Sequence, residues 1–229
     1  MTRSSRSSTA LCFALLAFAA LALVPSAASA GTLVDTAVSC DSYSLEQPFL
    51  RWDDTFNYVL APDGTFERRA RGWTLSGRAR VVPGNERYYV HRSGESRSLY
   101  LPSGSSATSP SMCVGIEYPT LRTFALNRRA AVSILKVEVL FEASQVDCLT
   151  SVGLLGAGSG VFSNGICRLP IGLLTGSRIW DVTVPMPVLA NLLPLLPDNR
   201  TAVAFRFSPQ DAAGDWRIDD VYVDPYRTR

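Results

Sequence analysis

WRIDDVYVDPY, from Trp216 to Tyr226, has the composition of a β-strand but carries two adjacent aspartates near its centre. β-Branched and aromatic residues favour strands, and successive side chains of an extended chain point to opposite faces. At least one of Asp219 and Asp220 therefore shares a face with apolar side chains. Because burying an unpaired carboxylate is costly, such an acid needs a donor or a cation. The stretch predicts both a strand and a site that neutralises an acid.

The same strand character recurs along the chain from residue 65 onward. Short runs rich in Val, Thr, Tyr and Phe alternate with Gly, Pro, Ser and Asn, which is typical of an all-β protein. In KVEVLFEA, which begins at Lys136, we expect Val137, Val139 and Phe141 to share one face of a strand, and Lys136, Glu138, Leu140 and Glu142 to share the other. We expect strands at residues 65–67, 73–75, 79–82, 88–92, 98–101, 107–114, 120–127, 135–143, 167–174, 180–184, 202–208 and 217–223.

One segment, PVLANLLPLLPDN at residues 187–199, breaks this pattern. Its apolar residues have helical spacing, but Pro194 and Pro197 disfavour a continuous helix. We expect a short helical turn near 188–195 that covers one open end of the β-structure, because large apolar residues are usually buried. The alternative is an exposed patch of Leu192, Leu193 and Leu195 that binds another protein.

The first thirty residues have the features of a secretory signal peptide. Arg3 and Arg6 precede an apolar run at residues 10–24, and small residues follow at 28–30. The run is shorter than the roughly 20 residues that span a bilayer, so we expect cleavage rather than anchoring. The predicted organisation is a signal peptide at 1–30, an N-terminal arm at 31–60 and one domain at 61–229. The mature chain would be secreted and contain no transmembrane segment.

Four cysteines remain after the predicted cleavage, and an even number in an exported chain indicates two disulfides. Three pairings are possible. We expect Cys148 to pair with Cys167, which closes a loop rich in Gly and Ser, and Cys40 to pair with Cys113, which ties the arm to the domain. A metal site is a weak alternative, because the chain has no CxxC motif and His91 is its only histidine.

Charge and motifs argue against several functions. Without Arg3 and Arg6 the acidic and basic residues are equal in number, which does not fit a nucleic-acid-binding protein. A serine hydrolase needs a histidine beside its nucleophile, yet the sequence has no GxSxG motif. Glu138 is among the acids that a glycosidase could use, but no spacing places two carboxylates across a cleft. We therefore expect no enzymatic activity.

The two ends of the predicted domain resemble a known group of β-sandwiches. A Phe-Glu pair at 66–67 lies just upstream of a Gly-Trp pair at 72–73, and Ile-Asp-Asp-Val at 218–221 closes the domain. This combination is similar to jelly-roll carbohydrate-binding modules and galactose-binding-like domains. APDGTFE, GWTLSG and WRIDDVYVDPY also look like a group of secreted bacterial proteins of unknown function with this fold. The resemblance implies a jelly-roll β-sandwich of two antiparallel sheets, and it implies no established activity.

The resemblance also implies a structural calcium ion where the first and last strands meet. Carried over residue by residue, its ligands would be Glu67 and Asp219 or Asp220. Ca²⁺ is a hard cation that prefers oxygen ligands, which suits this set. The alternative is that these acids accept hydrogen bonds from backbone amides or pair with an arginine.

Exposed aromatic side chains are the other candidates for ligand contact, because sugar rings can stack on them. The resemblance assigns Trp73 and Trp216 to the core, which leaves Trp52, Trp180 and the Tyr88–Tyr89 pair. If 88–92 is a strand with Val90 inward, Tyr89 and His91 point outward and could line a concave sugar-binding face with Arg92 or Glu95. The alternative is an ordinary solvated sheet face.

We therefore expect a secreted binding module for a polysaccharide or cell-envelope glycan. A structural or adhesive envelope protein that binds another protein is the second possibility. A glycan or ester hydrolase is the third, and it would depend on His91 or Glu138. The analogy is at the level of the fold, and one fold hosts many functions.

Overall fold

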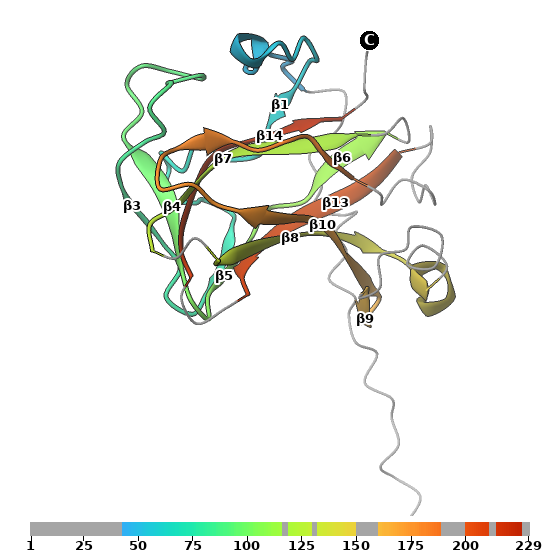
Figure 1. The fold of residues 1–229 in the computed structure, drawn as a ribbon. Helices are drawn as coiled ribbons and strands as arrows, with labels where there is room; N and C mark the ends of the chain where they lie inside the picture. Colours follow the sequence, from blue (N-terminus) through green and yellow to red (C-terminus); the bar gives the residue numbers. More distant parts are fainter. Residues whose placement is uncertain are drawn as a thin grey trace, which may run out of the picture.

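The computed structural model describes residues 43–115, 119–129, 132–149, 160–188, 200–210 and 214–225. Within these residues the chain forms a jelly-roll β-sandwich, in which two antiparallel seven-stranded sheets lie face to face (Figure 1). The first sheet contains β1 (Val59–Leu60), β3 (Arg80–Pro83), β4 (Arg97–Pro102), β7 (Thr120–Asn127), β11 (Asp181–Val182), β12 (Met186–Pro187) and β14 (Asp215–Asp224). The second contains β2 (Thr74–Ser76), β5 (Ser106–Thr108), β6 (Met112–Gly115), β8 (Ile134–Glu142), β9 (Val161–Ser163), β10 (Ile166–Thr175) and β13 (Arg200–Pro209).

The main core lies between the two sheets and follows the predicted alternation. In β8, Val137, Val139 and Phe141 share one face, as their spacing predicts, and the structure shows that this face is buried. They pair across the second sheet with alternate residues of the neighbouring strand β13. On the first sheet, Leu99 and Ile218 are directly opposite each other and fully buried. The period-two pattern therefore places one face of each central strand in a shared apolar layer.

A second aromatic cluster lies outside this layer, against the first sheet. Phe49, Tyr58, Phe124, Trp180 and Tyr222 form it, and the segment before β1 supplies its first members. The rings of Phe49 and Tyr58 meet edge to face with centroids 4.9 Å apart, an arrangement that aromatic pairs favour. A short 3-10 helix, η2 (Leu50–Trp52), carries Trp52 to the edge of the cluster. Residues 43–60 thus cover part of the outer face of the first sheet.

Two of the predicted strands are wrong. Residues 65–67 form a turn, because Phe66 has a φ of 57° that extended strands do not use. Residues 88–92 form an irregular connection between β3 and β4 rather than a strand. The predicted strand at 107–114 is also divided into β5 and β6. The remaining expected strands exist, with boundaries shifted by a few residues.

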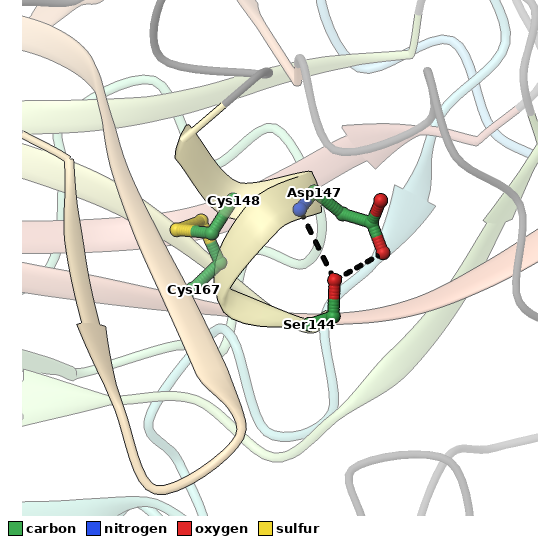
Figure 2. The surroundings of a disulfide bond; sticks show 4 residues. All are labelled: Ser144, Asp147, Cys148 and Cys167. Carbon is green, nitrogen blue, oxygen red and sulfur yellow. Dashed lines mark hydrogen bonds between the residues drawn. A yellow bond between two sulfur atoms is a disulfide. The ribbon is translucent and has the colours of Figure 1, made fainter.

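The disulfide between Cys148 and Cys167 is present, as predicted. It joins β10 to a helical turn at residues 145–149, and Figure 2 shows the two sulfurs beside that turn. Ser144 begins the turn: its Oγ accepts a hydrogen bond from the Asp147 amide at 3.1 Å, which is a helix N-cap. Cys113 is also disulfide-bonded. Its predicted partner Cys40 lies outside the described residues, so that pairing stays a prediction.

The predicted helical turn near 188–195 falls almost entirely at positions 189–199, which the structure does not describe. The same holds for the leucines of the protein-binding alternative. Across the described ranges, no helix has the length and apolar character needed to cross a bilayer.

Candidate functional site

A cleft of about 890 Å³ lies between the turn that follows β1 and the connection between β3 and β4. One wall is the turn after β1, which includes Asp63, Glu67 and Arg68. The other wall is the end of the β3–β4 connection, from His91 to Glu95. Binding sites are commonly concave regions with a few fixed polar groups. This cleft has that form, with charged side chains on both walls.

His91 and Glu95 form a hydrogen-bonded pair at the cleft. Nδ1 of His91 lies 2.5 Å from Oε1 of Glu95. The other Glu95 oxygen accepts a hydrogen bond from the Arg92 amide at 3.2 Å. The Glu95 side chain is 4% exposed and that of His91 is 16% exposed. The buried carboxylate therefore fixes the orientation of an imidazole whose edge reaches the cleft.

Two further acids hold the earlier part of the same connection. Both Glu86 carboxylate oxygens accept backbone hydrogen bonds, one from Tyr88 and the other from Val90 at 3.0 Å. The Glu86 amide in turn donates to Oδ2 of Asp219 at 2.9 Å. The connection has no strand partner here, so these side-chain acceptors satisfy amides that a sheet ladder would otherwise pair. Residues 86–95 are thus shaped by buried carboxylates.

Glu67 attaches the opposite wall to the first sheet. One of its oxygens accepts hydrogen bonds from the amides of Ser96 and Arg97, each at 2.7 Å. Asp63 shapes its own turn, since its two oxygens accept from the amides of Arg68 and Arg71. Each predicted calcium ligand except Asp220 therefore has backbone donors, which is the alternative that the sequence left open.

Asp220 is the exception among these acids. β14 has an irregular register between Asp219 and Tyr222, and Asp220 has a φ of 47°. Its side chain is buried, and neither oxygen has a hydrogen-bond partner among the residues that the structure describes. The two aspartates are therefore not simply on opposite faces of a regular strand. The irregular register turns Asp220 toward a group of other acids.

Burial raises the pKa values of Asp219, Asp220 and Glu86, and the charges of neighbouring acids add to the effect. Burial raises the pKa of Asp220 to about 8, and the charges of Glu95 and Glu86 add to the effect. Burial likewise raises the pKa of Asp219, with the adjacent Asp220 carboxylate as the next cause. Burial also raises the pKa of Glu86, although the hydrogen bonds from backbone amides to its carboxylate lower that pKa. The surroundings of Asp220 therefore favour a bound proton or a cation.

The predicted ligand-binding aromatics do not form a single site. Trp180 is 9% exposed and belongs to the aromatic cluster, while Trp52 is half-buried with its ring 4.9 Å from that of Tyr88. Tyr89 is 48% exposed and has a φ of 51°. Its outward position comes from the irregular connection and not from the strand alternation that the sequence suggested. Only His91 among the four lines the cleft.

Sequence reasoning missed Glu86 and Arg68, and it named Glu95 beside His91 without the hydrogen bond that joins them. The spacing of His91 and Glu95 by four residues was visible, but such a spacing brings side chains together in a helix and not in the expected strand. Glu86 carried no signal, because its role depends on Asp219, which lies 133 residues later. Within the described residues, no three His, Cys, Asp or Glu side chains are arranged to hold a metal ion.

No family model matches this chain, and no curated protein does. Several of the solved structures that it resembles are carbohydrate-binding modules. One is the N-terminal endo-1,4-β-D-xylanase 10B of Clostridium thermocellum, its CBM22-1 and GH10 modules complexed with xylohexaose. That likeness has 12% identity and a TM-score of 0.43, and it covers 70% of this chain and 27% of that one. A family 16 carbohydrate-binding module has 14% identity and a TM-score of 0.42, covering 72% and 98%.

A further likeness is to the C-terminal family 22 carbohydrate-binding module of the same xylanase, with 16% identity and a TM-score of 0.41, covering 72% of this chain and 92% of that module. These likenesses are distant, and they assign neither a ligand nor a site to this chain.

Proposed function

We propose that this protein is a secreted, non-catalytic module that binds a polysaccharide or cell-envelope glycan in the cleft between residues 61–68 and 91–95. The observation that carries the proposal is the His91–Glu95 pair, which presents an oriented imidazole at a cleft of about 890 Å³. A volume of this size lies within the range of small-ligand sites.

The chemistry of the cleft suits hydroxyl groups. Sugar hydroxyls both donate and accept, so a site needs both kinds of partner. Glu67 retains acceptor capacity beyond the backbone amides that it binds, and Arg92 and Ser93 are exposed donors. Tyr89 lies exposed two residues before His91 and offers a ring for stacking.

The rigidity of the walls also favours binding. Glu86 and Glu95 hold the 86–95 connection through its backbone amides, and Glu67 holds the other wall against residues 96 and 97. A site whose backbone is already fixed loses less conformational entropy when a ligand binds. The acids therefore contribute to recognition even where they do not touch the ligand.

The two alternative functions receive less support. Glu138, one of the two residues on which a hydrolase could depend, lies on β8 of the second sheet with Lys136 Nζ 2.9 Å from its Oε1. His91 lies in a connection of the first sheet, so the fold does not bring the two together. The leucines proposed for a protein partner lie outside the described residues, and that alternative stays a prediction.

Calcium remains part of the proposal through Asp220 alone. A buried carboxylate without a donor must hold a proton or a cation, and the two oxygens of Asp220 meet that condition. Glu67 and Asp219 already accept backbone hydrogen bonds, so we propose Asp220 as the principal side-chain ligand. A bound Ca²⁺ would neutralise the acids around Asp220 and stabilise the fold.

The test is retention of the purified chain on neutral polysaccharides such as xylan, galactan and β-glucan, by affinity electrophoresis. We expect retention on at least one, and a loss of at least tenfold in affinity for Tyr89→Ala and for His91→Ala. Leu173→Ala, a substitution of a 63% exposed residue on the second sheet, is the control and should not change affinity. Equal retention of all three variants would contradict the assignment of the cleft.

A further inference from the structure

A second hollow, of about 250 Å³, lies on the outer face of the first sheet. The register places Arg80, Tyr100 and Arg217 side by side on β3, β4 and β14. Their strand neighbours Leu99 and Leu101 are buried in the core, so this row faces away from the sandwich interior. The hollow is built from strands and from residues near 78, 103 and 129, and it shares no lining residue with the cleft.

Positive charge dominates this hollow. Arg78, Arg80 and Arg129 line it, and Asp215 is the one acid among its lining residues. Asp215 compensates little of the charge, because its Oδ2 lies 3.9 Å from Arg129 Nε and the Arg129 side chain is 75% exposed. Arg217 is close enough to Arg128 for their like charges to lower the pKa of Arg217, after the larger effect of burial.

Most of the guanidinium donors have no acceptor in the described part of the chain. Arg80 Nη1 donates to the Arg78 carbonyl at 3.2 Å, while the side chain of Arg78 has no partner there. The Arg80 guanidinium lies over the Tyr100 ring, 4.5 Å from its centroid. That cation–π contact holds the group in place but uses none of its N–H donors. The hollow therefore presents unused arginine donors, and the contact with Tyr100 orients those of Arg80.

We propose that this hollow binds an oxyanion group, a carboxylate or sulfate, carried by an acidic polysaccharide, with Arg78, Arg80 and Arg129 as the donors. Guanidinium groups pair with planar and tetrahedral oxyanions through two parallel hydrogen bonds, which suits several arginines around a small space. A volume of about 250 Å³ is below that of a site for a larger ligand. It fits one charged group or one charged sugar residue at a time.

The polysaccharide part of this inference rests on the proposed function, whereas the oxyanion site does not. A chain with both sites would bind neutral sugar residues in the cleft and charged sugar residues in the hollow on the first sheet. Simultaneous binding of two parts of one polymer raises the overall affinity without new contacts at either site.

The experiment measures binding of the purified chain to polygalacturonate, dextran sulfate and unsubstituted dextran. The first two probes distinguish carboxylate from sulfate, and dextran controls for the uncharged polymer. We expect affinity for at least one charged probe that falls steeply as salt is raised. Arg78→Gln combined with Arg80→Gln should weaken it at least tenfold, and Arg129→Gln should do so independently.

The matched control is Arg51→Gln combined with Arg87→Gln. These two exposed arginines also lie over a tyrosine ring, that of Tyr88, at 5.1 and 5.0 Å. The control thus removes the same charge and the same kind of contact elsewhere. Circular dichroism on all variants checks that they fold.

Three results would overturn the inference: no binding of either charged probe, salt-independent binding, or equal weakening by the control pair. The outcome for the cleft is separate. A chain that binds only neutral glycans supports the proposed function and refutes the oxyanion site. The opposite outcome is binding of the charged probes that depends on Arg78 and Arg80, with no effect of Tyr89→Ala or His91→Ala on any glycan. That outcome would support the oxyanion site and refute the cleft.

Discussion

Replacing Asp220 by asparagine should stabilise this protein near neutral pH when calcium is absent. The pKa of Asp220 is about 8 in the folded chain and about 3.9 in an unfolded chain, so its ionisation opposes folding by about 4 kcal/mol at pH 7. Asparagine removes the charge, and it tolerates the left-handed backbone at φ 47° better than most residues. The variant should therefore gain several kcal/mol in the free energy of unfolding.

The sign of the pH dependence follows from the raised pKa. Below about pH 4 the carboxyl is protonated in both states and has no effect. Between about pH 4 and 8 the unfolded chain has released the proton that the folded chain retains, so stability falls by about 1.4 kcal/mol per pH unit. Above the folded pKa the loss is complete. The difference between wild type and the Asp220→Asn variant should therefore grow as pH rises from 5 to 8.

The assay is urea unfolding, followed by tryptophan fluorescence, at pH 5, 6, 7 and 8 with a chelator present. Asp53→Asn is the control, because Asp53 is exposed and has a φ of 58°, so it has a similar backbone but no buried charge. A variant no more stable than wild type at pH 8 would refute the reasoning. Adding calcium in excess should stabilise wild type and leave Asp220→Asn unchanged, and equal effects on both would refute the calcium proposal.

Three other substitutions test the fold around the site. Cys148→Ser with Cys167→Ser opens a cross-link between residues 19 apart and should cost about 3 kcal/mol in chemical unfolding. Phe124→Ala empties the middle of the aromatic cluster on the first sheet, which should cost about 3–5 kcal/mol and make the 43–60 segment more sensitive to limited proteolysis. Gly64→Ala places a Cβ 2.8 Å from the Val221 carbonyl and should lower the melting temperature, whereas Gly94→Ala, with nothing within 4 Å, should leave it unchanged.

The sequence predicted those parts of the fold that local pattern determines. Val137, Val139 and Phe141 alternate with polar residues, and burial of one face explains their positions. Pairing of Cys148 with Cys167 was also accessible, because the two cysteines flank a segment rich in Gly and Ser. Local pattern failed at residues 65–67, where Phe66 is buried from a turn rather than from a strand.

The site was less predictable because its geometry depends on contacts between distant residues. Glu67 accepts hydrogen bonds from the amides of residues 29 and 30 positions later. The Glu86 amide donates a hydrogen bond to Asp219, 133 positions later. No periodicity encodes such contacts. The sequence did identify Asp219 and Asp220 as acids that need compensation. It could not show that Asp219 would accept hydrogen bonds from backbone amides and that Asp220 would not.

Carboxylates hold residues 86–95 through their backbone amides, so the path of this connection does not depend on which exposed side chains it carries. Glu86 and Glu95 bind backbone amides, which every residue except proline possesses. Arg92 and Ser93 can consequently change while the backbone path persists, and Tyr89 can change to residues that tolerate its positive φ. Such a connection is suited to diversification: a library that randomises these three positions and retains both glutamates would vary ligand preference on a constant framework.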